Sequence, residues 1–261
     1  MRRHEGSSHR FDGTDAIGKA YRGAFNDTQA QELAAHALSH AVQRAGLEGG
    51  EVEDVIFGCA VQQGSSGVNV ARQAVLRAGL PDTVSGMSID RQCSSGLMAI
   101  ATAAKQILGD GMQIAVGGGV ESISLVQNDH MNTHRAADPW LIEHKPSIYL
   151  PMLHTAEIVA ERYGVSRERQ DEFALVSQQR TAAAQEAGRF DQEIVALDSV
   201  KRVLDKQSGE VSGRGPVVGR HPLHGAGDGD RGPAGAAGGG HRRHRLLHGL
   251  GAAAERQQAQ R

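Results

Sequence analysis

Residues 89–107 read IDRQCSSGLMAIATAAKQI, and the hydrophobic period changes in the middle of this stretch. The preceding SGMSIDRQ, 85–92, is typical of a strand, whereas apolar side chains after Cys93 recur at the spacing of a helix. The predicted buried face of that helix consists of Leu97, Ile100, Ala101, Ala104, Ile107 and Leu108. The sequence therefore predicts one cysteine at the turn between a strand and a helix.

Helices and strands alternate on the N-terminal side of this turn and continue after it. A helix is expected from Thr28, where Gln31 has the spacing of a capping box, to the natural stop at Gly46. Further elements are predicted as a helix over 69–79 and buried strands over 53–62 and 111–125. This alternation favours a layered α/β sheet. The glycines at 117–119 are expected to pack closely beside the cysteine rather than to cradle a phosphate, because the GxGxxG spacing is missing.

The second half of the chain has a different character. An irregular stretch from 126 to 151 precedes helices over 154–164 and 166–188, the second with Phe173 near its apolar face. A strand pair over 193–211, with its turn at Ser208–Gly209, is predicted to follow.

Composition divides the chain into four parts. Segment 1–16 is polar, 17–125 forms the α/β core, 126–212 forms a mainly helical cap or loop domain, and 213–261 is rich in glycine, arginine and histidine. The last part has too little apolar surface to offset its conformational entropy, so it is predicted to be disordered.

Bulk properties exclude several classes of protein. The chain has 261 residues and a formal net charge of −2, which argues against nucleic acid as its main partner. No run reaches the roughly 18 apolar residues of a membrane span, and the N-terminus does not resemble a secretory signal. Its two cysteines, Cys59 and Cys93, lack CxxC spacing. Free thiols, a cytoplasmic location and no metal site are therefore expected.

Cys93 has the setting of a covalent catalyst. The N-terminus of a helix carries partial positive charge and unpaired N–H groups, and both favour a thiolate over a thiol. Ser94, Ser95 and Gly96 are small and leave room for a bulky electrophile. The local pattern alone leaves open a second interpretation, in which Cys93 is a buried cysteine that packs as a small hydrophobic residue.

Longer motifs resemble one family. IDRQCSSGLMAI (89–100), GGGVESIS (117–124) and TAE (155–157) are similar to motifs of the thiolases, the acetyl-CoA C-acyltransferases. Further agreement lies in IGKAYRGAFND (17–27), GCAVQQG (58–64), NVARQA (69–74) and SRERQDEFALVSQQRTAAAQEAGRFDQEIV (166–195). The resemblance covers most of 17–210. One departure is Asp90, where many members carry asparagine.

The resemblance implies an acyl-transfer mechanism. The Cys93 thiolate would attack the 3-keto carbon of a 3-ketoacyl-CoA, acetyl-CoA would leave, and free coenzyme A would take the acyl group, or the reverse condensation would run. Coenzyme A is then a co-substrate, and no bound cofactor is expected. The resemblance also implies fatty acid metabolism, with a lean toward β-oxidation, and a homo-oligomer when the protein is intact. The fold implied is a layered α/β domain with a mixed five-stranded sheet whose first strand is central, and with an inserted helical cap.

Some of the family's catalytic groups have no counterpart in this sequence. Thiolases also use a histidine in GHPxG, a second cysteine in CxG and an asparagine in NEAF, and NEAF is absent. Cys59 precedes the nucleophile within a predicted strand, and His221 in GRHPLHGAG (219–227) has an arginine before it. Neither is expected to be the second acid/base. His130, His134, His144 and His154 are expected at the surface or in packing roles, with contact to coenzyme A as the alternative.

Both ends of the chain suggest altered reading frames. SHRFDGTDA (8–16) can be encoded so that the frame shifted by one base reads VIVSTARTP, which matches the family's first strand. We therefore expect an incomplete sheet with unpaired strand edges and bare apolar faces. A truncated chain of marginal stability, without full turnover on its own, follows from this hypothesis.

Two other functions stay open. The first is a ketoacyl-synthase-type condensing enzyme, which shares a strand–cysteine–helix site but lacks the cap helices. The second is a non-enzymatic fragment that binds an intact homologue.

Overall fold

The computed structural model of this chain describes residues 21–204 and 211–214. The polar segment 1–16, the turn at Ser208–Gly209 and residues 215–261 of the tail lie outside the described residues. The predicted disorder is wrong for Gly213 and Arg214, which belong to a strand. The described residues form two compact units, 21–131 with 185–204 and 211–214 in the first, and 132–184 in the second. The domain boundaries expected from the sequence stay predictions.

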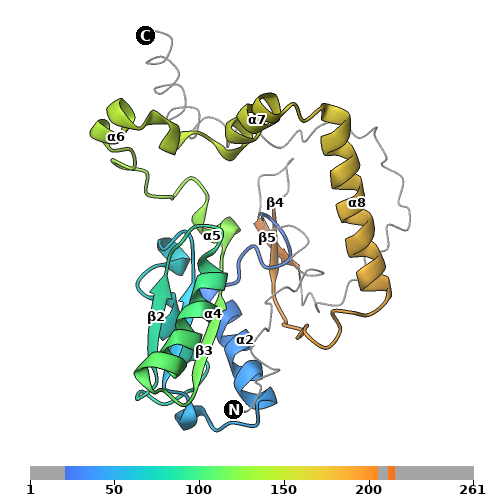
Figure 1. Cartoon of the computed structure of the whole chain (residues 1–261). Helices are drawn as coiled ribbons and strands as arrows, with labels where there is room; N and C mark the ends of the chain where they lie inside the picture. Colours follow the sequence, from blue (N-terminus) through green and yellow to red (C-terminus); the bar gives the residue numbers. More distant parts are fainter. Residues whose placement is uncertain (1–20, 205–210, 215–261) are drawn as a thin grey trace. The chain divides into compact units, whose positions relative to one another are not determined.

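The first unit is built on a three-stranded parallel sheet (Figure 1). Its strands are β1 (Asp54–Gly58), β2 (Ser85–Ile89) and β3 (Ala115–Gly119), in the order β2-β1-β3. All three lie within the predicted strands, and each is shorter than its prediction. The layered α/β fold is confirmed.

The central strand β1 is paired along both edges. Its last residue, Gly58, is in register with Ile89 of β2 and with Gly119 of β3. Among the described strands, β2 and β3 each pair with β1 alone, and the expectation of unpaired edges from a missing first strand stays a prediction. The common register aligns the carboxyl ends of the three strands, which is the edge where open parallel α/β sheets bind ligands.

Helices cover both faces of the sheet, as the uninterrupted burial of β1 requires. On one face, α2 (Ala30–Arg44) and α3 (Val70–Arg77) pack with Val55 and Phe57 in the main hydrophobic core. The predicted helix 69–79 is confirmed in detail. Asn69 caps α3 by accepting a hydrogen bond from the N–H of Arg72, and Gly79 follows the helix with φ of +76°.

The other face of the sheet is covered by α4 (Ser95–Lys105). The prediction of which side of this helix is buried is wrong. The buried apolar residues of α4 are Ala99 and Ala103, which pack with Ile56 of β1. Leu97 is 72% exposed and Leu108, which follows the helix, is 76% exposed. The reason is the size of the residues on the sheet: glycines face α4, and only a row of small side chains fits against them.

Two glycines set how closely α4 approaches the sheet. A Cβ on Gly58 would lie 2.2 Å from the carbonyl carbon of Ser95, at the first turn of α4. A Cβ on Gly117 would lie 2.7 Å from the Cα of Ile100, one helical turn further on. The expected close packing of 117–119 is confirmed. The backbone of α4 therefore packs directly against the backbone of the sheet, and no residue larger than glycine fits at either position.

We expect Gly58→Ala to lower the free energy of unfolding by about 1–3 kcal/mol, because the added methyl group forces α4 away from β1. Gly109→Ala is the matched control, since a Cβ at that position has nothing within 4 Å. The control is expected to be neutral or to stabilise by up to about 1 kcal/mol. Urea unfolding monitored by circular dichroism measures the free energy of unfolding of both variants. An equal effect of the two substitutions would contradict the close packing of α4 against β1.

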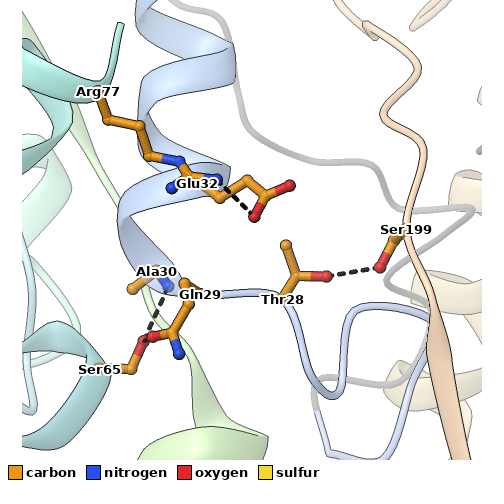
Figure 2. A network of polar contacts seen from close by, with 7 residues as sticks. All are labelled: Thr28, Gln29, Ala30, Glu32, Ser65, Arg77 and Ser199. Atoms are coloured by element: carbon orange, nitrogen blue, oxygen red, sulfur yellow. Dashed lines mark hydrogen bonds and ion pairs between the residues drawn. The ribbon is translucent and has the colours of Figure 1, made fainter.

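The N-terminal end of α2 and its capping also differ from the prediction. The helix begins at Ala30 after Gln29, and Thr28 is not its cap. Figure 2 shows the contacts that replace the capping box. The hydroxyl of Thr28 lies 2.5 Å from that of Ser199, and both residues are buried. Ser65 Oγ accepts a hydrogen bond from the Ala30 N–H and donates one to the Gln29 side chain. Long-range partners therefore displace the local cap.

We expect Thr28→Val to lower the free energy of unfolding by about 1–3 kcal/mol, because the buried Ser199 hydroxyl loses its partner. Adding Ser199→Ala removes the unpaired hydroxyl and should restore part of that loss. Urea unfolding of the two single variants and the double variant measures the coupling. Strictly additive losses would show that the two hydroxyls do not interact.

The rest of the first unit consists of short elements. These are η1 (Gly49–Glu51), η2 (Gly64–Ser66), the π-helix η3 (Gln106–Asp110), α5 (Ile123–Val126), and the antiparallel pair β4 (Lys201–Leu204) and β5 (Val211–Arg214). An antiparallel strand pair is present, but both strands lie late relative to the predicted range 193–211: β4 begins eight residues after 193, and β5 begins only at Val211.

The second unit contains α6 (Pro139–His144), η4 (Pro146–Tyr149), α7 (Met152–Tyr163) and most of α8 (Arg167–Glu186). The two predicted helices and the stop of α7 at Gly164 are confirmed. The predicted apolar face of α8 is not buried, and Phe173 is 75% exposed. Among the described helices, none combines the length and hydropathy needed to cross a bilayer.

Candidate active site

Cys93 lies in the turn that joins β2 to α4, two residues before the helix begins. It is exposed, so the alternative of a buried packing cysteine is wrong. Gln92 has φ of 50°, a left-handed backbone conformation that L residues rarely adopt. The Ser94 hydroxyl donates to the carbonyl of Arg91 at 2.8 Å and helps to close the turn. The predicted strand–cysteine–helix arrangement is confirmed.

A pocket of about 630 Å³ opens beside Cys93. Gly58 and Gly119 contribute the ends of β1 and β3, and Gly96 contributes the first turn of α4. Apolar side chains reach it from Phe25, Leu33 and Ile123. The pocket therefore joins a thiol, a helix N-terminus and an apolar wall at the carboxyl edge of a parallel sheet, where such sheets bind ligands.

Glu121 ties two sides of this pocket together. Its carboxylate accepts hydrogen bonds from the N–H groups of Ala60 at 2.8 Å and Val61 at 3.3 Å, and Glu121 lies two residues after the end of β3. Glu121, Ala60 and Val61 all line the pocket. The carboxylate therefore fixes the loop after β1 against the segment after β3, and backbone N–H groups satisfy its charge.

The second thiol has the opposite environment. Cys59 is 1% exposed and directs its Sγ toward the carbonyl of Val61 and the carboxylate of Glu121, each at 3.7 Å. Burial raises the pKa of the Cys59 thiol to about 11, and the negative charge of Glu121 adds to the rise. Cys59 therefore stays a neutral thiol near pH 7, and its expected lack of an acid/base role stays a prediction.

We expect iodoacetamide at about pH 8 to modify Cys93 and to leave Cys59 unmodified, because only thiolates react and the raised pKa keeps Cys59 protonated. Modification of Cys59 should grow only as the pH approaches 11, or when the protein unfolds. Peptide mass spectrometry after timed labelling measures each site. Equal labelling of the two cysteines in the folded protein at pH 8 would contradict the assigned environments.

The histidines proposed from the sequence are not brought together at this site. His144 stacks on Trp140 with ring centroids 4.1 Å apart, a packing role as expected. His130 and His134 are exposed in the loop after α5, and His154 lies on α7. His221 lies outside the described residues. The possible contact of these residues with coenzyme A stays a prediction.

Sequence reasoning missed the carboxylate and the far wall of the pocket. Glu121 lies inside the quoted motif GGGVESIS, and the available signal was a charged residue within a predicted buried strand, 111–125. Phe25 and Leu33 reach the pocket from the segment before α2 and from α2 itself. Nothing in their local pattern distinguishes them from ordinary core residues.

The fold and the site define a parallel α/β protein with an exposed cysteine at the carboxyl edge of its sheet. A family model described as the N-terminal domain of thiolase matches residues 13–212. The 3-ketoacyl-CoA thiolase of Bacillus subtilis is 41% identical over 183 residues. The acetyl-CoA acetyltransferase of Rhizobium meliloti is 39% identical over 206 residues. The chain belongs to the thiolase family.

Solved structures agree with this assignment. The crystal structure of the Bacillus anthracis acetyl-CoA acetyltransferase is similar with a TM-score of 0.56 and 36% sequence identity, over 74% of this chain and 50% of that one. The Bacillus subtilis and Rhizobium meliloti matches cover 70% and 76% of this chain, and 46% and 51% of those proteins. The chain thus spans about half the length of the curated relatives it matches.

Proposed function

We propose that Cys93 is the acyl-accepting nucleophile of a thiolase-type acyltransferase. The observation that carries the proposal is the position of this exposed thiol, at the N-terminal turn of α4 and on the wall of the pocket of about 630 Å³. A cysteine thiolate in this position can attack a carbonyl carbon of a substrate in the pocket. The substrate is a 3-ketoacyl-CoA, and coenzyme A is the second substrate.

The reaction forms and breaks one bond at each stage. The Cys93 thiolate attacks the 3-keto carbon, the C2–C3 bond breaks, and the electron pair stays on C2 as the enolate of acetyl-CoA, which takes up a proton. The thiolate of free coenzyme A then attacks the acyl-cysteine, and Cys93 leaves as a thiolate. The reverse sequence is a Claisen condensation.

Residues of this chain account for the binding part of that chemistry. Gly96 lines the pocket and a Cβ there would meet nothing within 4 Å, so it leaves space for the tetrahedral carbon. Phe25 and Ile123 offer apolar contact to an acyl chain. The carboxylate of Glu121 is hydrogen-bonded to backbone N–H groups. We therefore assign Glu121 a role in shaping the pocket and not in proton transfer.

Protonation of the enolate needs a second acid/base. The family draws it from motifs that the sequence of this chain does not contain, and Cys59 does not replace it because it is buried and is not among the residues that line the pocket. We therefore propose that this chain forms the acyl-cysteine and does not turn over efficiently by itself. A cytoplasmic location, homo-oligomerisation and a β-oxidative role stay predictions.

We expect incubation of the full chain with acetyl-CoA to add one acetyl group to Cys93, because the transfer needs only the thiolate and the pocket. Intact-mass and peptide mass spectrometry measure the adduct. Cys93→Ala should abolish it, and the matched control Cys59→Ser should retain it. An adduct that persists in Cys93→Ala, or none on a folded wild-type chain, would contradict the proposal.

A further inference from the structure

Asp90 follows the last residue of β2 and begins the turn that carries Cys93. Its carboxylate oxygen Oδ1 accepts a hydrogen bond from the N–H of Gln92 at 2.7 Å. This is the contact by which an aspartate or asparagine side chain holds the backbone two residues ahead in a tight turn. Asp90 itself is exposed, and the same oxygen also lies 3.4 Å from the hydroxyl of the buried Ser95.

The contact acts on the residue whose backbone is unusual. Gln92 has φ of 50°, and this conformation persists only where surrounding groups hold it. The carbonyl of Gln92 is held as well, since the buried Ser95 donates its hydroxyl to it at 2.6 Å. Ser95 Oγ also accepts the N–H of Arg91 at 2.8 Å. Both polar groups of the Gln92 backbone are therefore fixed by side chains on either side of Cys93.

Gln92 is the residue directly before the thiol, so its backbone conformation decides where Cys93 lies. If Gln92 relaxed to negative φ, the chain would leave the turn in another direction. Cys93 would then move relative to the start of α4 and to the pocket that Gln92 and Cys93 line together. Small displacements of a reacting atom have large effects on rate.

We propose that Asp90 is a positioning residue for Cys93: its side-chain oxygen holds Gln92 in the left-handed conformation and thereby places the sulfur at the N-terminal end of α4 beside the pocket. The importance of this role for acyl transfer rests on the proposed function of Cys93. The hydrogen-bond acceptor matters here, and the negative charge does not. An asparagine would offer the same oxygen without the charge.

The substitutions Asp90→Asn and Asp90→Ala separate these two properties. Both remove the charge, and only the first keeps the acceptor, so the ratio of their rates reports the hydrogen bond alone. Asp82→Ala, which removes another exposed carboxylate from the loop between α3 and β2, is the control for general charge loss. Ser95 is left unchanged because it is buried.

The experiment uses the full chain and measures two rates at Cys93 by peptide mass spectrometry. These are alkylation by iodoacetamide and acetylation by acetyl-CoA. We expect Asp90→Ala to be alkylated about tenfold more slowly than Asp90→Asn, with acetylation slowed at least as much, because a misplaced sulfur loses its position and orientation beside the pocket. Asp82→Ala should react at the wild-type rate. Cys59 should stay unmodified in every variant, which reports an intact core.

Equal alkylation rates in Asp90→Ala and Asp90→Asn would overturn the positioning role. Modification of Cys59 in Asp90→Ala alone would overturn it too, since Asp90 would then support the core. A wild-type chain that is alkylated at Cys93 but never acetylated would instead contradict the proposed function. In that case the alkylation rates of the two Asp90 variants still decide the role of Asp90.

Discussion

The close contact between α4 and the backbone of the sheet is the constraint on which the rest of the site depends. Gly58 and Gly117 leave no room for a Cβ, so the helix lies directly on β1 and β3. The first turn of α4 is thereby fixed over the carboxyl end of β1. The connection between β2 and α4, which carries Cys93, is held in place with it. Replacing either glycine by a larger residue would displace α4 and, with it, the Cys93 thiol.

The same edge of the sheet makes two thiols behave differently. Cys59 follows β1 into the interior, where burial and the carboxylate of Glu121 raise its pKa to about 11. Cys93 follows β2 into an exposed turn at the start of a helix. Two cysteines at neighbouring strand ends thus become an inert packing group and a candidate nucleophile, because one is buried beside the Glu121 carboxylate and the other is exposed on the wall of a pocket.

Sequence reasoning predicted the order of helices and strands and the place of Cys93, because hydrophobic periods and glycine stops are local signals. It was wrong about the buried face of α4, since that depends on glycines of strands distant in sequence. It was also wrong about the cap of α2, because the Thr28 hydroxyl pairs with Ser199, 171 residues away. Glu121 was missed for the same reason: its partners belong to another strand end.

The family assignment and the geometry of the site both point to the sulfur of Cys93 as the reacting atom. The most direct test is a crystal structure of the chain after exposure to acetyl-CoA. The account predicts electron density for an acetyl thioester on Cys93, in the pocket between the ends of β1 and β3, with α4 seated on Gly58. An acetyl group on Cys59, or a Cys93 sulfur that faces away from the pocket, would contradict it.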